Sequence, residues 1–344
     1  MTTVRLNGEH FEVDGDTTIA TLVETLGGGN VSTPAGLSGP GIAVAVNGRV
    51  VPRREWSQTR IAEGDDVRLV KAVAGGAPND SFEDPKPLVI AGRTFQSRLF
   101  VGTGRFISPA VMRAALAASE TEMVTVAIRT TGVDGSGPDA GILAAIDLKR
   151  YHLLPNTAGA TSVRQAVFMA ELAREALGTN WVKLEVIGDE RTLWPDVTGT
   201  VEATRILVRE GFVVLPYTTT DLVTALRLEE AGAATVMPLG SMIGSGQGIG
   251  DWAAIRRIVE RVRVPVVVDA GIGTPSDAAT AMEAGADACL INTAISRSDN
   301  PTTMARAMRL AVDAGRLGYL AGRMPRSDVA IPSSPPTGVV TVGA

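Results

Sequence analysis

The feature that most constrains the fold is a short apolar segment that recurs eight times between residues 98 and 292. The segments begin near residues 98, 123, 152, 181, 212, 235, 265 and 288, and most are separated by helical text such as SVRQAVFMAELAREALG. Short apolar runs that alternate with helices are typical of buried parallel strands. Eight such units, spaced by 23–31 residues, predict an α/β fold of the (β/α)8 TIM barrel type. A doubly wound open sheet is the alternative, and the regular spacing disfavours it.

Residues 1–76 have a different pattern, with Asn-Gly turns between short strands. TVRLNGEHFEV and GIAVAVNGRVV each indicate two strands around such a turn, and DGDTTIATLVETLGGGN between them indicates a helix. A last strand follows at DDVRLVKAV. Two hairpins and one helix predict a ubiquitin-like β-grasp domain at the N-terminus.

A polar, proline-containing segment, GGAPNDSFEDPKP, lies between the two patterns and indicates a linker. The 344 residues, of which 45% are hydrophobic and 20% charged, are sufficient for one large and one small domain. We therefore expect a domain over 1–76, a linker over 77–87, a barrel over 88–323 and a C-terminal tail over 324–344.

Composition excludes several classes of function. A net charge of −5, with only four Trp and three Tyr, disfavours a nucleic-acid partner. The sequence has no uncharged apolar run of about 18 residues and no signal-peptide core at its start, so we expect a cytoplasmic protein with no membrane partner. One Cys and two His exclude a disulfide framework and disfavour a metal site.

One charged pair interrupts the fourth predicted strand, WVKLEV. Lys183 and Glu185 alternate with apolar residues, so both lie on one face of the strand. That face either points outward against a helix or lines the barrel. The seventh strand ends in a lone carboxylate, Asp269, which favours the second alternative, because active-site groups of barrels lie at strand C-terminal ends. A lysine beside carboxylates suits imine chemistry, since lysine can lose its proton and attack a carbonyl, whereas arginine cannot.

Glycine-rich segments follow the sixth, seventh and eighth predicted strands. PLGSMIGSGQGIG by itself could be only a flexible loop. DAGIGTPSDA and INTAIS follow the strands after which barrels often bind phosphate through backbone N–H groups. We expect a phosphorylated substrate held mainly by the backbone at Gly244, Gly271 and the Asn292–Thr293 turn, with Arg297 more distant.

These stretches together resemble a known family. Residues 88–323 are similar to bacterial thiazole synthase, the thiamin-pathway enzyme that builds the thiazole ring. The similarity is carried, in order, by GTGRF, LLPNTAGA, WVKLEVIGD, PLGSMIGSGQGI, VPVVVDAGIGTPSDAA and INTAIS. Residues 1–76 resemble the β-grasp sulfur carrier of the same pathway in AVAVNGRVVPRREW and the terminal VAGG.

The resemblance implies that Lys183 forms an imine with the ketone of 1-deoxy-D-xylulose 5-phosphate, and that Glu185 and Asp269 move protons. It also implies dehydroglycine as co-substrate, sulfur from a carrier thiocarboxylate, a carrier-adenylating enzyme as partner, a homo-oligomeric barrel and no cofactor. The substrate contacts it implies are Gly244, Ala270, Gly271, Asn292 and Thr293.

The sequence departs from the carrier pattern at one point. Free carriers end at the Gly-Gly pair, here Gly75 and Gly76, whereas this chain continues with Ala77 and so locks that carboxylate in an amide. Either the chain is cut after Gly76, or this domain does not carry sulfur. Two further alternatives are an aldolase-like imine enzyme acting on a phosphosugar, which leaves the N-terminal domain unexplained, and an interaction protein with an inert barrel.

Overall fold

The computed structural model describes residues 1–27, 42–71, 84, 86–128 and 145–333. The chain divides into two compact units, Met1–Phe82 with Ser327–Ala344, and Glu83–Arg326. The predicted sulfur-attachment residues Gly75 and Gly76 lie outside the described residues, as do most of the predicted linker and the end of the predicted tail.

The N-terminal unit is a five-stranded sheet with one α-helix, ordered β2-β1-β5-β3-β4. β1 and β5 are parallel neighbours at the centre, β2 pairs with β1 on one side, and the β3–β4 hairpin pairs with β5 on the other. Asn7 and Asn47 have positive φ at the two hairpin turns, as Asn-Gly turns require. The prediction of a ubiquitin-like β-grasp domain is confirmed. Its elements are β1 (Thr2–Leu6), β2 (Glu9–Val13), α1 (Ile19–Gly27), β3 (Ile42–Val46), β4 (Arg49–Val51), the 3-10 turn Arg53–Glu55 and β5 (Asp66–Lys71).

The core of this unit comes from the apolar face of α1 and the inward side chains of the strands. Ile19 and Leu22 are fully buried against Val4, Val44 and Val67. The spacing of apolar residues along α1 therefore places one helical face on the sheet, and this burial is the main stabilising contribution to the small unit.

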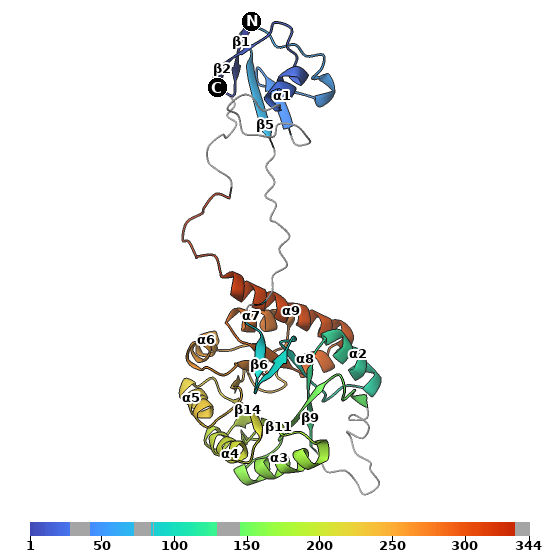
Figure 1. Ribbon diagram of the computed structural model, residues 1–344, viewed down its shortest axis with the longest axis vertical. Coiled ribbons are helices and arrows are strands. Elements are labelled where there is room, and N and C mark those ends of the chain that lie inside the picture. The colour runs from blue at the N-terminus through green and yellow to red at the C-terminus, as the bar shows by residue number, and fades with distance from the viewer. Residues whose placement is uncertain (28–41, 72–83, 85, 129–144, 334–344) are drawn as a thin grey trace. The chain divides into compact units, whose positions relative to one another are not determined.

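The second unit contains an eight-stranded parallel sheet surrounded by helices (Figure 1). The sheet order is β15-β14-β11-β10-β9-β8-β17-β16, and single parallel bridges, Val236 to Val266 and Leu239 to Asp269, join its two edges. The prediction of a TIM barrel is thus confirmed. Its strands are β8 (Leu99–Gly102), β9 (Met123–Ala127), β10 (His152–Asn156), β11 (Trp181–Leu184), β14 (Val213–Thr218), β15 (Met237–Pro238), β16 (Val267–Asp269) and β17 (Ala288–Ile291).

Most helices of this unit begin at a side-chain cap, which explains where the chain leaves each loop. Ser108, Ser162, Asp196, Asp221 and Asp251 each accept a backbone N–H in the first helical turn. The helices of this unit are α2 (Pro109–Ser119), α3 (Val163–Leu177), α4 (Val197–Arg209), α5 (Leu222–Glu230), α6 (Trp252–Arg261), α7 (Pro275–Glu283), α8 (Thr293–Ser296) and α9 (Pro301–Ala321).

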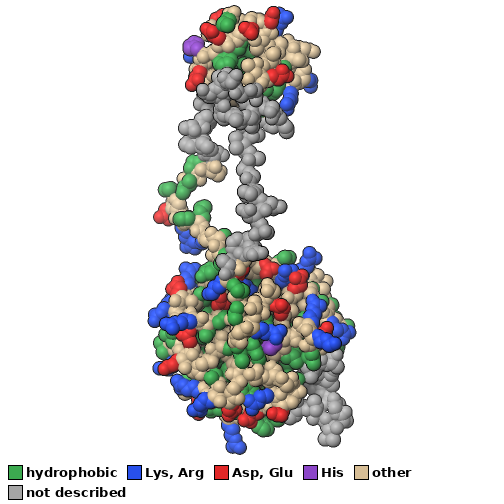
Figure 2. Space-filling view, viewed as in Figure 1, with side chains coloured by type: hydrophobic (Ala, Val, Ile, Leu, Met, Phe, Trp, Pro, Cys, Tyr) green, Lys and Arg blue, Asp and Glu red, His purple; other side chains and the backbone are tan. Residues whose placement is uncertain are grey.

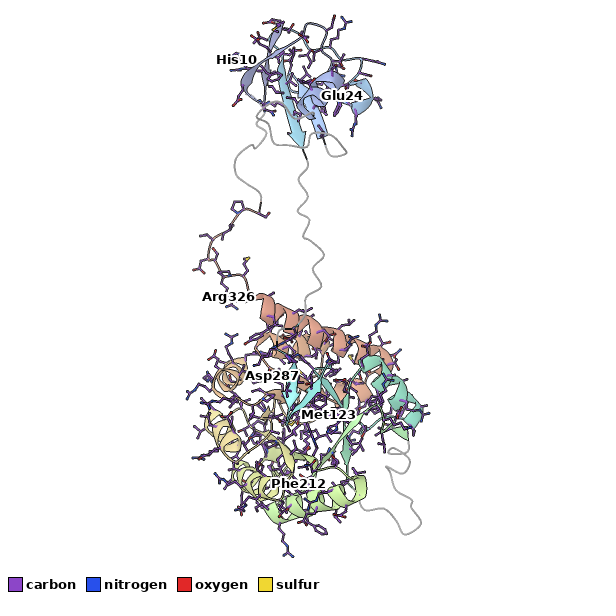
Figure 3. All side chains as sticks on the ribbon, in the orientation of Figure 1. His10, Glu24, Met123, Phe212, Asp287 and Arg326 are labelled. Atoms are coloured by element: carbon purple, nitrogen blue, oxygen red, sulfur yellow. The ribbon has the colours of Figure 1, made fainter. Side chains whose placement is uncertain are left out.

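A hairpin, β6 (Leu88–Ile90) with β7 (Arg93–Phe95), precedes the barrel and closes the end where the strands begin. Ile90 and Phe95 pack with Met123 and Trp181, which start strands β9 and β11. Met123, labelled in Figure 3, is fully buried. Because apolar side chains fill this end, the opposite end, where the strands finish, is the one open for a site.

Asp84 is tied to the barrel at the closed end. Its carboxylate accepts hydrogen bonds from Arg98 at 2.7 Å and from Arg316 of α9 at 2.9 Å. Arg98 precedes β8 and also donates to the carbonyl oxygen of Asp287, which precedes β17. Burial raises the pKa of Asp84, but the Arg316 hydrogen bond and both guanidinium charges outweigh it and lower that pKa to about 2.

The surface carries both signs of charge. On the face shown in Figure 2, basic and acidic side chains are interspersed over the barrel. Within the described part of the chain, no helix has the length and apolar character needed to cross a membrane.

Candidate active site

Lys183, Glu185 and Asp269 meet inside the barrel at the ends of strands β11 and β16. The Lys183 Nζ atom lies 2.6 Å from Asp269 Oδ2 and 3.2 Å from Glu185 Oε1. The three side chains are only 4–6% exposed. Glu185 lies one residue beyond the end of β11, yet its side chain turns to the same side as that of Lys183. The pair therefore faces the barrel lumen and not an outer helix.

Burial and the carboxylates act in opposite directions on the Lys183 amine. Burial alone would lower the pKa of Lys183, but the charges of Asp269 and Glu185 outweigh it and hold the pKa above its ordinary value. For Asp269, burial dominates over the attraction of Lys183 and raises its pKa. The resting site thus holds an ammonium beside a carboxyl group that binds a proton more readily than usual.

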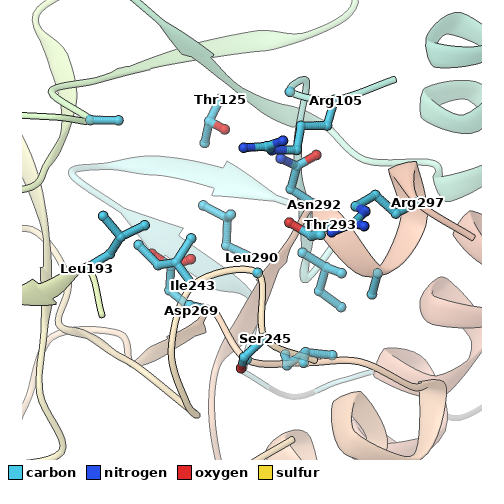
Figure 4. Close-up of a pocket in the computed structure, with 18 of the residues that line it drawn as sticks. Arg105, Thr125, Leu193, Ile243, Ser245, Asp269, Leu290, Asn292, Thr293 and Arg297 are labelled. Atoms are coloured by element: carbon cyan, nitrogen blue, oxygen red, sulfur yellow. The ribbon is translucent and has the colours of Figure 1, made fainter. Parts of the chain in front are cut away.

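A pocket of about 1090 Å³ opens above this cluster (Figure 4). It is lined by the ends of several strands and by the loops that follow β15, β16 and β17. All eight residues that the sequence and the family resemblance assign to catalysis or substrate binding line it: Lys183, Glu185, Asp269, Gly244, Ala270, Gly271, Asn292 and Thr293.

The loop after β16 has a backbone shape that fits tight contact with a ligand. Ala270 and Gly271 have φ values of 70° and 79°, so two consecutive residues are left-handed. For Ala270 this conformation costs about 1–2 kcal/mol, which the surrounding contacts must offset. A Cβ atom on Gly271 would overlap the backbone of Ser241, and one on Gly273 would overlap Gly246. Only glycine allows these loops to approach each other so closely.

Asn292 fixes the neighbouring loop after β8. With its amide nitrogen turned toward the backbone, Asn292 donates to the carbonyl oxygens of Gly102 at 3.1 Å and Gly104 at 3.0 Å. A Cβ atom on Gly102 would overlap the Asn292 side chain, so glycine is required there. The Asn292 side chain therefore acts on the protein's own backbone, which leaves its main chain and Thr293 to face a ligand.

Several pocket residues carry no sequence pattern that marks them. Arg105 in the loop after β8, Thr125 in the middle of β9 and Asn156 at the end of β10 line the same cavity. Arg105 belongs to the GTGRF stretch and Asn156 to the LLPNTAGA stretch, so the family resemblance was the available signal for these two. Thr125 belongs to neither stretch, and only the closed barrel brings it to the site.

A second hairpin, β12 (Ile187–Asp189) with β13 (Trp194–Pro195), borders the pocket through Ile187 and Leu193. Leu193 has a positive φ of 55°, and its carbonyl oxygen accepts from the Tyr217 hydroxyl at 3.4 Å. The Tyr217 ring in turn lies 5.7 Å from Lys183 Nζ, within cation–π range. Tyr217 thus contacts both the hairpin and the lysine.

No group of three or more His, Cys, Asp or Glu side chains among the described residues is placed to hold a metal ion. Cys289 is fully buried in β17, where burial raises the pKa of its thiol to about 12. A thiol so held is inert as a nucleophile.

Comparison with known families gives two matches that together span most of the chain. Residues 89–335 match the family described as thiazole biosynthesis protein ThiG, and residues 4–76 match the ThiS family.

Individual proteins give the same result. The chain is 43% identical to a thiazole synthase of Paramagnetospirillum magneticum over 97% of its own length and 99% of that protein. It is 55% identical to a thiazole synthase of Methylobacterium sp. over 74% of its length and 94% of the relative. Among solved structures, a chain from the Amycolatopsis orientalis BexX/CysO complex is 37% identical with a TM-score of 0.64, and the match covers 71% of this chain and 100% of that one.

Proposed function

The chain belongs to the ThiG family of thiazole synthases, with a ThiS-family domain at its N-terminus, and we propose that its reaction proceeds through an imine on Lys183. The ketone substrate is 1-deoxy-D-xylulose 5-phosphate, and the amine that attacks it is Lys183 Nζ. The observation that carries the proposal is a lysine fully enclosed with two carboxylates at the base of the pocket.

The first step is loss of the Lys183 proton, because an ammonium has no lone pair with which to attack. Asp269 Oδ2, at 2.6 Å, is the nearest acceptor, and burial raises the pKa of its carboxyl group. The neutral amine then forms the C–N bond at the ketone carbon. The carbonyl oxygen takes up protons and leaves as water, which gives the imine.

Later steps move protons along the sugar carbons, and Glu185 is the second group placed to carry them. Its Oε1 atom lies 3.2 Å from Lys183 Nζ, so it reaches atoms adjacent to the imine nitrogen. Its backbone N–H donates to Thr157 Oγ1 at 2.8 Å, and Thr157 donates back to the Glu185 carbonyl oxygen. These bonds fix the backbone that positions the carboxylate.

The phosphate is held where the glycine-rich loops converge. Gly244 and Gly271 line the pocket and have no side chain of their own, and Thr293 adds a hydroxyl at the start of α8. Arg297, also at the pocket, supplies a positive charge to this side. In this proposal, backbone N–H groups supply most of the hydrogen bonds to the phosphate, and Arg297 supplies the charge.

Sulfur comes from a carrier that ends in a Gly-Gly thiocarboxylate. In this chain Gly76 is followed by Ala77, so the N-terminal domain serves only after cleavage between them, or a separate carrier serves the barrel.

Dehydroglycine is the proposed co-substrate, a carrier-adenylating enzyme is the proposed partner that prepares the thiocarboxylate, and the barrel is proposed to form a homo-oligomer. An aldolase-like activity would leave the N-terminal domain without a role. An inert barrel would give no reason for the enclosed Lys183, Glu185 and Asp269 cluster.

The test is reconstitution with the phosphosugar, dehydroglycine and a thiocarboxylate carrier, using wild-type protein and Lys183→Arg. Arginine keeps the charge and bulk but cannot form an imine, so thiazole formation is expected only with the wild type. Full activity of the arginine variant would refute the proposal. For the carrier, intact-mass measurement of protein from its native host decides whether cleavage after Gly76 occurs. Thiazole formation by an uncut chain without another carrier would contradict the cleavage requirement.

A further inference from the structure

The mouth of the barrel has two arcs of different chemistry. Around the closed sheet, the loops after β15, β16 and β17 form a glycine-rich arc that includes Gly244, Gly271 and Thr293. The ends of β8, β9 and β10 form the other arc, which contributes Arg105, Thr125 and Asn156 to the same pocket. β11, which carries Lys183, lies next to the second arc. The proposed phosphate site uses the first arc and leaves the second without a role.

Arg105 is the charged group of the second arc. The cationic side chains that line the pocket are Lys183, Arg105 and Arg297. Lys183 forms ion pairs with Glu185 and Asp269. None of the ion pairs found between described residues involves Arg105 or Arg297. In Figure 4 the two arginines lie on either side of Asn292. Within the described part of the chain, neither arginine has an anionic partner, so each can pair with an anion that enters the pocket.

The loop that carries Arg105 is held in a defined shape. Arg105 itself has a φ of 66°, which is uncommon for a residue with a side chain. The Asn292 amide donates to the carbonyl oxygens of Gly102 and Gly104, which lie three residues and one residue before Arg105. Thr103 Oγ1, which is buried, donates to the carbonyl oxygen of Thr125 at 2.8 Å. A loop fixed this way sets the origin of the guanidinium before a ligand arrives, which reduces the entropy lost on binding.

Resting on the proposed function, we infer that Arg105 binds the carboxylate of the second substrate, an α-imino acid. The reactive atoms of such a molecule are its imine carbon and nitrogen, so the carboxylate remains free as a handle. A guanidinium matches a carboxylate with two parallel hydrogen bonds and stays charged at any working pH. Thr125 and Asn156, on the strands between Arg105 and Lys183, supply neutral polar groups for the imine nitrogen.

The carrier thiocarboxylate is a poorer fit to this position. Its charge disappears as sulfur bonds to carbon, whereas the carboxylate of the imino acid persists while the reactive atoms change. A fixed cation therefore serves the imino acid through successive steps. It also separates that carboxylate from the carboxyl groups of Glu185 and Asp269, which line the same pocket.

The experiment uses full-length protein and oxamate, a planar unreactive analogue of the imino acid, with dehydroglycine supplied from glyoxylate and ammonia. Arg105→Gln is expected to raise the oxamate inhibition constant about 10- to 100-fold, as for loss of a charge-assisted pair. Borohydride trapping of the phosphosugar at Lys183 is expected to keep its wild-type concentration dependence. The matched variant Arg297→Gln should weaken phosphosugar trapping and leave the oxamate inhibition constant unchanged. Arg105→Lys should restore part of the oxamate affinity.

Three results would overturn the inference. The first is unchanged oxamate inhibition in Arg105→Gln. The second is weakened phosphosugar trapping in that variant to the same degree, which would assign Arg105 to the phosphate. The third is a change in Arg105→Gln that appears only in how the rate depends on the concentration of the thiocarboxylate carrier. Failure of the proposed function is distinct, because it would appear as absence of trapping at Lys183 in the wild-type protein.

Discussion

The Asp269 carboxylate has two proposed roles: it stabilises the Lys183 ammonium, and it accepts the proton of that ammonium. Replacing Asp269 with Asn separates the two. At an effective dielectric constant of about 20, ions 2.6 and 3.2 Å apart attract by about 6 and 5 kcal/mol. Burying the ammonium costs several kcal/mol. The attraction of the two carboxylates together exceeds this burial cost, in keeping with the raised pKa of Lys183. The attraction of Glu185 alone nearly equals the burial cost. The pKa of Lys183 should therefore fall in Asp269→Asn.

The expected result is that borohydride trapping of the phosphosugar extends to lower pH in Asp269→Asn than in the wild type, because more amine is neutral. Turnover should nevertheless fall roughly 10²–10⁴-fold, since an amide cannot carry the proton. Both are measured on the same preparations, trapping by intact mass across a pH series and turnover by single-turnover assay.

The matched control is Asp221→Asn, which makes the same change at the cap of α5, where Asn also caps well. It should leave both profiles unchanged. An unshifted trapping profile together with near wild-type turnover in Asp269→Asn would refute the assignment of Asp269 as the group that exchanges a proton with Lys183.

Three further predictions concern the catalytic pair, the loop and the anchor. Glu185→Gln should permit trapping but slow single turnover by roughly 10²–10⁴-fold; a wild-type rate would remove Glu185 from the mechanism. Gly271→Ala should weaken phosphosugar binding at least tenfold by calorimetry, because its Cβ overlaps Ser241 and φ is 79°; unchanged affinity would count against the loop. Asp84→Ala should lower the free energy of unfolding in urea at pH 7 by about 2–3 kcal/mol, since two buried guanidinium groups lose their carboxylate. With a folded pKa of about 2 against an ordinary 3.8, this contribution is complete above pH 3.8 and is lost as the pH falls through 2; equal midpoints at pH 7 would contradict it.

The sequence predicted the barrel because its signal is repeated and local. Each buried strand is a short apolar run, and eight runs leave few other arrangements. Lys183 and Asp269 were visible for the same reason, since each is a charge at an otherwise apolar strand. Both residues lie at the same end of the barrel because all its strands run parallel, and in the closed barrel they approach to 2.6 Å.

The parts that escaped prediction depend on contacts between distant segments. Thr125 lies in none of the stretches that carry the family resemblance, and barrel closure alone brings it to the pocket. Asp84 belongs to a polar stretch expected as linker, and only Arg98 and Arg316 give it a structural role. Sequence spacing does not reveal partners 14 and 232 residues away.

The central claim is that Lys183 is the amine that forms the imine. Its most direct measurement is peptide mapping by mass spectrometry after borohydride reduction of the full-length protein with 1-deoxy-D-xylulose 5-phosphate. The account predicts one adduct, with the mass of the reduced phosphosugar, on the peptide that contains Lys183, and none in Lys183→Arg. An adduct at Lys71, Lys86 or Lys149, or an undiminished adduct in Lys183→Arg, would contradict it.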